Sequence, residues 1–382
     1  MDQSAYITQT LQKLVQINSV NPSLEAGGGG EEEIGRFISA ELSSLGIQHE
    51  IEPIADKRVN VTATIPGTGS GKSLILNAHM DTVGTSGMDA PFSGDIKNGK
   101  LYGRGSYDMK ASIAAILCTA KTLIEEGQKP AGDLILSFVA DEEFESIGAK
   151  RFVEKYRADA AIVTEPTDLQ ICLAHRGFGV FKITTQGKTA HGGEHRLGVD
   201  ANTSMALLLA ELHTYGKRLP EEINHPLCGE ASMHVPLIEG GNSLFIYSNR
   251  CTAHLERRTL PGETEQSVMN ELNRIVRSLE KTEPDFNASI ESLIWRDPYE
   301  IDRNRPIVKH VESASAAVLG KPSGVIGHTW WEDSGIFGKA GIETVILGPA
   351  GGGIHEAEEW AELQSVEKLS EILYRTVVDF CR

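Results

Sequence analysis

A histidine and two aspartates have side chains and spacing that suit a metal centre. His79 follows the apolar run Leu-Ile-Leu-Asn-Ala, and Asp81 lies two residues further on. Residues two apart on an extended backbone point to the same side, so Asp81 is placed to steady a metal-bound imidazole. Asp108 offers a carboxylate from a second loop, Gly-Arg-Gly-Ser-Tyr-Asp-Met-Lys. If all three act together, the chain is a metal-dependent hydrolase.

Further ligand-type residues follow other apolar runs. Taken alone, each could be an ordinary polar residue. Several ligand-type residues at the ends of separate buried strands predict one shared site, because ligands of α/β sheets bind beyond the carboxyl ends of strands. The five predicted metal ligands are His79, Asp108, Glu143, Glu165 and His355.

The charges of these residues favour two metal ions. Two Zn²⁺ ions bring four positive charges, three carboxylates and two neutral imidazoles return three negative ones, and a bridging hydroxide completes neutrality. Without metal, the crowded carboxylates would repel one another and at least one would take up a proton. Oxygen and imidazole ligands suit Zn²⁺, and Co²⁺ or Mn²⁺ could bind similarly.

Three adjacent acids, Asp141, Glu142 and Glu143, follow an apolar run. On an extended segment neighbouring side chains point apart, so Glu143 could bind metal while Glu142 faces water and substrate. Glu142 is therefore the predicted general base, because a metal already lowers the pKa of bound water. The alternative is a solvated acidic loop.

The apolar patterns on either side of these residues predict the elements that position them. Strands alternating with helices indicate an α/β fold with helices on both faces of the sheet. The sequence pattern changes after Arg176. Alternating apolar residues typical of strands, and two helical patterns, predict an α+β insert there. We expect a catalytic domain from 1–176 and 296–382 and an inserted domain from 177–295. The predicted strands are 60–65, 73–77, 133–140, 160–164, 178–186, 244–255, 288–295, 323–327 and 343–347. The predicted helices are 4–16, 31–45, 109–126, 146–157, 199–218, 266–279, 306–319, 332–340 and 363–379.

Composition excludes several functions. A net charge of −17 over 382 residues argues against nucleic acid and anionic membranes as partners. No apolar run reaches the roughly 20 residues of a membrane span, and the start has no signal-peptide pattern. The 5 cysteines are scattered and form no C-x-x-C pair, which is typical of reduced thiols in a cytoplasmic protein.

Together these motifs resemble the zinc-dependent aminoacylases and carboxypeptidases that include acetylornithine deacetylase, succinyl-diaminopimelate desuccinylase and glutamate carboxypeptidase. The resemblance extends over nearly the whole chain. The matching segments are Asn-Ala-His-Met-Asp-Thr-Val, Gly-Arg-Gly-Ser-Tyr-Asp-Met-Lys, Asp-Glu-Glu, Thr-Glu-Pro, Gly-Lys-Thr-Ala-His and Gly-Gly-Gly-Ile-His-Glu.

The resemblance implies a zinc-peptidase-like catalytic domain with a mixed, largely parallel sheet, and a ferredoxin-like insert that serves as dimerisation and lid domain. It implies that Asp108 bridges two Zn²⁺ ions, with His79 and Glu165 on one ion and Glu143 and His355 on the other. Asp81 would orient His79, and the Asp108–Met109 peptide bond would be cis.

The inserted domain carries two further residues that the resemblance marks. His191 would reach the active site of the partner subunit in a homodimer and stabilise the oxyanion. Arg258 would hold the substrate carboxylate, and its alternative role is a structural ion pair. Gly192 and Gly193 after His191, and the pair Trp330 and Trp331, depart from the family pattern.

These departures leave the acyl and amine specificity open. The expected reaction is hydrolysis of an N-acyl amino acid, as in a deacetylase or desuccinylase. The alternatives are a di- or tripeptidase or carboxypeptidase on the same site, a non-catalytic binding protein, and a regulatory or dimerisation protein.

Overall fold

The computed structural model describes residues 2–382, so Met1 of the predicted catalytic domain lies outside the described residues. The chain divides into two compact units. Unit 1 holds the residues up to Leu173 together with Ile301–Ile326 and Glu332–Arg382. Unit 2 holds Ala174–Glu300 and Gly327–Trp331. In residues 2–382 no helix combines the length and the apolar character needed to cross a membrane.

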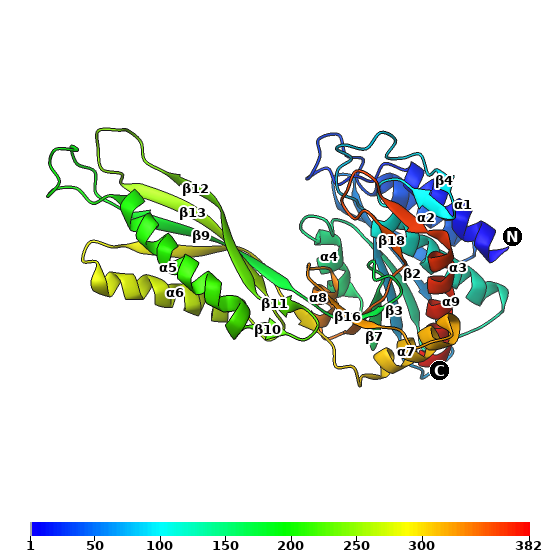
Figure 1. The fold of residues 1–382 in the computed structure, drawn as a ribbon. Coiled ribbons are helices and arrows are strands. Elements are labelled where there is room, and N and C mark those ends of the chain that lie inside the picture. The colour runs from blue at the N-terminus through cyan, green and yellow to red at the C-terminus, as the bar shows by residue number, and fades with distance from the viewer. Residues whose placement is uncertain (1) are drawn as a thin grey trace. The chain divides into compact units, whose positions relative to one another are not determined.

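Unit 1 is built on a mixed sheet with the strand order β1-β2-β6-β3-β7-β17-β8, in which β16 pairs with β8. Figure 1 labels β2, β3 and β7 of this sheet. The central strands β6, β3, β7 and β17 are parallel, and β1 and β2 extend the sheet in antiparallel fashion. The central strands are buried along their length, which explains their unbroken apolar sequences. The strands are β1 (His49–Ala55), β2 (Arg58–Ile65), β3 (Leu74–His79), β6 (Leu134–Val139), β7 (Ala160–Val163), β8 (Ile171–His175), β16 (Val325–His328) and β17 (Glu343–Ile346).

Helices cover this sheet in two groups. In one group α3 packs against α1 and α9, and α9 packs against α7, while in the other α4 packs against α8. Phe152 of α4 and Phe337 of α8 are buried with ring centroids 5.7 Å apart, over Ile75, Ile135 and Val163 of the sheet. The helices are α1 (Gln3–Gln16), α2 (Glu32–Ser44), α3 (Ala111–Glu125), α4 (Ile147–Lys155), α7 (Pro306–Leu319), α8 (Ser334–Lys339) and α9 (Leu363–Phe380).

A small second sheet of unit 1 has the strand order β18-β19-β5-β4. It joins segments that are far apart in sequence, because β19 pairs with β5 through Trp360 and Tyr102. The π-helical turn η1 (Ser106–Lys110) follows β5 and leads into α3. The strands are β4 (Ile96–Lys97), β5 (Lys100–Tyr102), β18 (Gly351–Gly352) and β19 (Trp360–Glu362).

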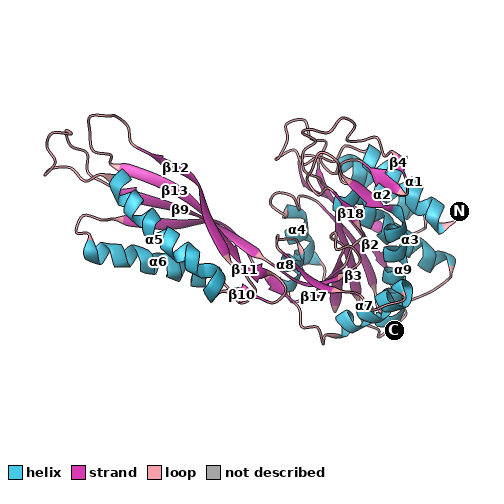
Figure 2. Cartoon of the chain, viewed as in Figure 1, coloured by secondary structure: helices cyan, strands magenta, loops and turns pink. Residues whose placement is uncertain are grey.

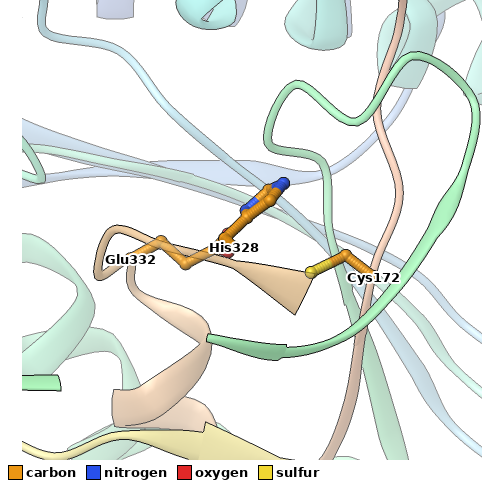
Figure 3. A group of neighbouring side chains, drawn as sticks. All are labelled: Cys172, His328 and Glu332. Atoms are coloured by element: carbon orange, nitrogen blue, oxygen red, sulfur yellow. The ribbon is translucent and has the colours of Figure 1, made fainter. Parts of the chain in front are cut away.

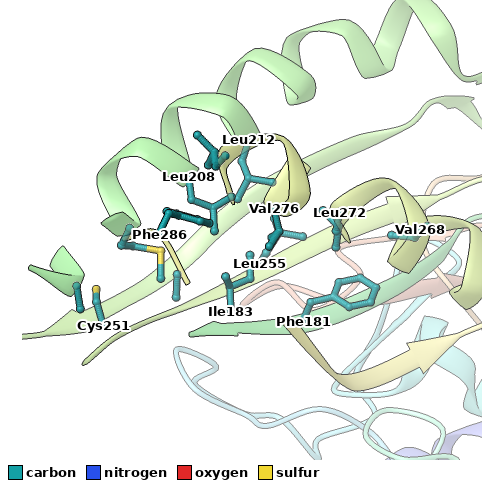
Figure 4. Close-up of a cluster of buried hydrophobic side chains, with 14 residues drawn as sticks. Phe181, Ile183, Leu208, Leu212, Cys251, Leu255, Val268, Leu272, Val276 and Phe286 are labelled. Carbon is teal, nitrogen blue, oxygen red and sulfur yellow. The ribbon is translucent and has the colours of Figure 1, made fainter. Parts of the chain in front are cut away.

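Unit 2 is an antiparallel sheet with the order β12-β13-β9-β14, and two helices lie along one face (Figure 2). Between helices and sheet lies a core that includes Leu208, Leu272, Phe181 and Leu255 (Figure 4). The helices are α5 (Ala201–Glu222) and α6 (Glu265–Thr282). The strands of this sheet are β9 (Gly177–Gln186), β12 (Ser232–Gly240), β13 (Arg250–Thr259) and β14 (Ala288–Arg296). A separate pair is formed by β10 (Asn224–His225) and β11 (Gly229–Glu230), and β15 (Tyr299–Glu300) pairs with β8.

The fold class expected from the sequence is confirmed: unit 1 is an α/β unit with a mixed sheet, and unit 2 is an α+β unit with an antiparallel sheet. Two predicted details of unit 2 are wrong. The strand predicted over 244–255 runs from Arg250 to Thr259, and Leu244 and Phe245 lie exposed in the loop before it. The edge strand β12 is missing from the prediction, because Pro236 interrupts its sequence pattern, where the pairing with β13 is also irregular between His234 and Leu237.

Candidate metal centre

Three predicted ligands reach one edge of the unit 1 sheet. The parallel strands β6, β3 and β7 are neighbours, so their carboxyl ends lie side by side. His79 is the last residue of β3, Glu143 follows β6 in a turn, and Glu165 follows β7 by two residues. The sheet itself therefore brings these three side chains together.

The other two predicted ligands come from loops. Asp108 lies in η1, and its peptide bond to Met109 is cis, which confirms the expectation from the family resemblance. His355 lies between β18 and β19 with a left-handed backbone, φ 60°. Its side chain is about half exposed, whereas the side chain of His79 is buried.

Asp108 lies between the two histidines. Its Oδ1 is 3.1 Å from Nε2 of His79, and its Oδ2 is 3.2 Å from Nε2 of His355. Glu165 Oε1 is 3.7 Å from Nε2 of His79, and Glu143 Oε2 is 3.2 Å from Nε2 of His355. Two groups of three possible ligands thus share Asp108, and the ligand atoms within each group lie within 4.8 Å of one another.

The chemistry of these side chains fits two divalent cations. Glu143 Oε1 and Glu165 Oε1 are buried without a hydrogen-bond partner in residues 2–382. Buried polar atoms in proteins are normally paired, and a cation would pair both. Burial raises the pKa of Glu165 well above its usual value, and burial with the neighbouring Asp108 also raises that of Glu143. A nearby positive charge would reverse both shifts.

The acidic neighbours of His79 and His355 favour the protonated form of both imidazoles. Although burial opposes it, contact with Asp108 raises the pKa of His79 well above its usual value. Hydrogen bonds to Asp108 and Glu143 raise the pKa of His355 to about 10. Metal ligation requires neutral imidazoles, so these protons must leave when a metal binds.

Asp81 does more than the sequence predicted. Its main-chain carbonyl lies 3.0 Å from Nδ1 of His79, and its carboxylate Oδ1 lies 3.6 Å from the same nitrogen. The carboxylate accepts hydrogen bonds from the backbone amides of Glu142 at 3.1 Å and Glu143 at 3.3 Å. Asp81 therefore positions both the imidazole and the acidic loop.

Glu142 lies in a turn rather than in the predicted extended segment. Asp141 adopts a left-handed backbone, φ 70°, and Glu142 to Glu145 form the turn. Burial and the nearby carboxylate of Glu165 raise the pKa of Glu142 well above its usual value. A raised pKa makes a carboxylate a better proton acceptor, as a general base requires.

Beneath this turn lies a buried polar network that sequence reasoning missed. Arg58 binds the carboxylate of Glu31 with two nitrogens, at 2.6 and 2.7 Å, and that of Asp141 at 2.8 Å. Asn21 donates to Asp81 at 2.8 Å and to Asp141 at 2.9 Å. The residues of this network come from distant parts of the chain, so no local sequence pattern indicates them.

Two predicted site residues, His191 and Arg258, belong to unit 2. The loop of His191 pairs with the loop before β13: Gly192 N donates to Phe245 O at 2.8 Å. Arg258, near the end of β13, pairs with Glu256, and its guanidinium lies 5.1 Å from the ring centroid of Phe178. Their roles stay predictions.

A third group of ligand-type residues comprises Cys172, His328 and Glu332 (Figure 3). All three are buried. Cys172 and Glu332 belong to unit 1 and His328 to unit 2, so we assign them no site.

An α/β unit that gathers two histidines and two glutamates around one shared aspartate, with a further glutamate beside them, defines a metal-dependent hydrolase. The chain belongs to peptidase family M20/M25/M40, whose sequence profile matches residues 75–379. It is thus a hydrolase of amide or peptide bonds from a metal-dependent family.

Known proteins similar to the chain differ in their substrates. Acetylornithine deacetylase of Proteus mirabilis is 28% identical over 97% of this chain and 95% of its own length. The structure of aminopeptidase PepT from Bacillus cereus has a TM-score of 0.80 and 20% identity, with 99% of each chain covered. A Bacillus subtilis structure, a dinuclear metal-binding M20 peptidase, has a TM-score of 0.74 and 16% identity, covering 99% of this chain and 98% of its own.

Proposed function

We propose that the protein hydrolyses the amide bond of an N-acyl amino acid, with two Zn²⁺ ions held by His79, Asp108, Glu143, Glu165 and His355. The observation that carries this proposal is the pair of ligand groups that share Asp108. Co²⁺ or Mn²⁺ can substitute in such an oxygen and nitrogen site. The similarity to acetylornithine deacetylase supports the deacylase reaction.

Bound metal would polarise the scissile carbonyl and lower the pKa of water. The chain's own residues supply the proton transfers. The Glu142 carboxylate takes the proton of the attacking water and later donates a proton to the leaving amine nitrogen. Asp81 keeps Glu142 in place through its backbone amide. His191 of the partner subunit donates a hydrogen bond to the developing oxyanion.

Glu142→Gln tests the base, because the amide keeps the size of the side chain but cannot take up the proton. We expect kcat to fall about 10²- to 10⁴-fold with metal content unchanged. Glu145→Gln is the matched control, since Glu145 is an exposed acid of the same turn. Activity near the wild-type level in a Glu142→Gln enzyme with two bound metals would exclude the proposed role.

The second candidate function is peptide hydrolysis, which the similarity to an aminopeptidase structure supports at the level of fold. A panel of N-acetyl and N-succinyl amino acids, dipeptides and tripeptides separates the two, assayed with Zn²⁺ and with Co²⁺. Higher kcat/KM for the acylated substrates supports the deacylase. Preference for free amino termini favours the peptidase. No hydrolysis of any substrate with two metals bound would favour a binding or regulatory protein.

Arg258 is the proposed ligand of the substrate carboxylate. Its pairing with Glu256 and contact with Phe178 hold the guanidinium while leaving about a third of the side chain exposed. Arg258→Ala should raise KM for substrates with a free carboxylate and leave KM for their amides unchanged. Equal effects on both substrates, together with lower thermal stability, would support the structural ion pair instead.

Unit 2 is the proposed dimerisation and lid domain. Its edge strand and the following loop expose large apolar side chains: Leu237 63%, Ile238 57%, Leu244 94% and Phe245 75%. Apolar groups at a sheet edge suit pairing with a second copy. The five cysteines are buried, as is typical of the reduced thiols of a cytoplasmic protein, which supports the proposed cytoplasmic location.

A further inference from the structure

One buried ion pair connects three loops of the proposed metal centre. Glu359 and Arg104 are 1% and 2% exposed, and Nη1 of Arg104 lies 2.8 Å from Oε2 of Glu359. The pair joins segments 255 residues apart, next to the pairing of β19 with β5. Neither residue was singled out as a candidate in the sequence.

Glu359 binds the backbone that carries Asp108. Its Oε2 accepts from the amide of Gly105 at 2.9 Å, and its Oε1 accepts from the amides of Tyr107 at 2.9 Å and Asp108 at 3.0 Å. Gly105 is needed there, because its φ is 77° and a Cβ would lie 2.5 Å from Thr82. One carboxylate thus fixes the backbone that leads into the shared ligand.

Arg104 carries the same restraint to two other loops. Its Nη2 donates to the carbonyl of Glu356, the residue after His355, at 2.9 Å. Its Nε donates to the carbonyl of Gly84, in the segment that follows His79 and Asp81, at 2.9 Å. Apart from the bond between them, the side chains of Arg104 and Glu359 therefore bind main-chain groups of loops that carry proposed metal ligands.

We propose that Glu359 and Arg104 are positioning residues that set the metal affinity of the Asp108–Glu143–His355 group. Two of the three ligands in that group lie on loops that the pair holds. In the His79–Asp108–Glu165 group only Asp108 lies on a loop that the pair holds close to the ligand. His79 ends β3, Glu165 lies two residues after β7, and Arg104 reaches the segment after His79 only at Gly84. Loss of the pair should weaken the first of these groups more than the second. This inference rests on the proposed two-metal function.

The test measures each metal affinity separately. Metal-free wild type and Glu359→Gln are titrated with Co²⁺, followed by its visible absorption, and with Zn²⁺ by calorimetry. In Glu359→Gln the side-chain NH₂ group is a donor, so it cannot accept the hydrogen bonds that one carboxylate oxygen of Glu359 accepts. His355→Ala identifies which of the two dissociation constants belongs to the Asp108–Glu143–His355 group. In Glu359→Gln we expect that constant to rise about 10- to 100-fold, and the other by less than about 3-fold.

Two conservative variants keep the test valid if Glu359→Gln does not fold. Arg104→Lys keeps the charge but cannot make all three contacts, and should weaken the same site. Glu359→Asp keeps the charge and should have an intermediate effect. The matched control is Glu263→Gln, which breaks the ion pair of Glu263 with the buried Arg257 in unit 2. This variant should leave both metal affinities unchanged.

The outcomes separate this inference from the proposed function. If wild type binds fewer than two metals, the two-metal proposal fails. If wild type binds two and the Glu359 and Arg104 variants bind both as tightly, only the positioning role fails. Equal weakening at both sites, or the same weakening in Glu263→Gln, would also overturn the positioning role.

Discussion

The two histidines of the proposed metal centre have acidic neighbours that favour their protonated form. For His355 the pKa is raised to about 10, so in the metal-free protein its imidazole is charged at neutral pH. This ion pairing stabilises the fold fully below the ordinary pKa of 6.5, and the contribution is lost as pH rises through about 10. Metal binding removes the same proton.

We therefore predict that metal affinity rises with pH. Each proton displaced on binding should make the apparent affinity about tenfold stronger per pH unit up to the raised pKa. Calorimetric titration with Zn²⁺ at pH 6, 7 and 8, in buffers of different ionisation enthalpy, counts the protons released. An affinity that does not change over this range, with no proton release, would contradict the protonated histidines.

Asp81 gives a second prediction at the residue scale. Asp81→Ala removes the acceptor for the amides of Glu142 and Glu143, while the main-chain carbonyl that faces His79 remains. We expect kcat to fall about 10- to 100-fold even at saturating metal, because the base loses its fixed position. Activity assayed against metal concentration checks this. Full recovery of kcat at high metal would show that Asp81 acts on metal binding alone.

At the scale of elements, sequence and structure agree best where one apolar run becomes one central strand. Ligand-type residues at or shortly after the carboxyl ends of β3, β6 and β7 could be grouped, because parallel strands end at one edge of the sheet. The turn at Asp141 could not be predicted, because its left-handed backbone depends on the network beneath it. The exposed Leu244 and Phe245 resembled a strand because a surface loop and a buried strand can share apolar residues.

The network of Asn21, Glu31, Arg58 and Asp141 could not be predicted either, because its contacts join segments up to 120 residues apart. It supports the loop that carries Glu142. Three carboxylates and one guanidinium are buried together, counting Asp81, so each acid relies on Arg58 and on amide donors. Removal of the single positive charge would leave buried acids unpaired.

Arg58→Met should therefore lower the free energy of unfolding by about 3–5 kcal/mol. Urea denaturation followed by circular dichroism measures the loss. The matched control is Arg36→Met, which breaks an exposed pair with Glu32 and should cost less than about 1 kcal/mol. Similar losses in both variants would mean that the buried network has no special part in stability.

At the scale of the whole molecule, the proposed dimer depends on exposed apolar groups of unit 2. Ile238→Asp places a charge on the edge strand β12 and should shift sedimentation from dimer to monomer. Leu24→Asp is the control, since Leu24 is an exposed leucine of unit 1. An unchanged sedimentation coefficient for Ile238→Asp would place the dimer interface elsewhere, and a wild-type monomer would exclude the dimer.

The loop of His191 is bonded to the exposed loop of Phe245, so a partner that covers Phe245 would also meet His191. Action of His191 in a partner subunit predicts complementation between two inactive variants. In a mixed dimer of Glu142→Gln and His191→Ala, one site has an intact Glu142 and receives His191 from the other subunit. Random pairing at equal amounts should then restore about a quarter of wild-type activity.

The measurement uses the two variants carrying different affinity tags, co-expressed and purified through both tags to isolate the mixed dimer. Each variant alone sets the background. The mixed dimer should have about half the wild-type activity per molecule, since one of its two sites is complete. If His191 acts within its own subunit, neither site is complete, because Glu142 and His191 then never come intact to the same site. Activity at background in a stable mixed dimer would therefore reject action in the partner subunit while leaving the dimer itself intact.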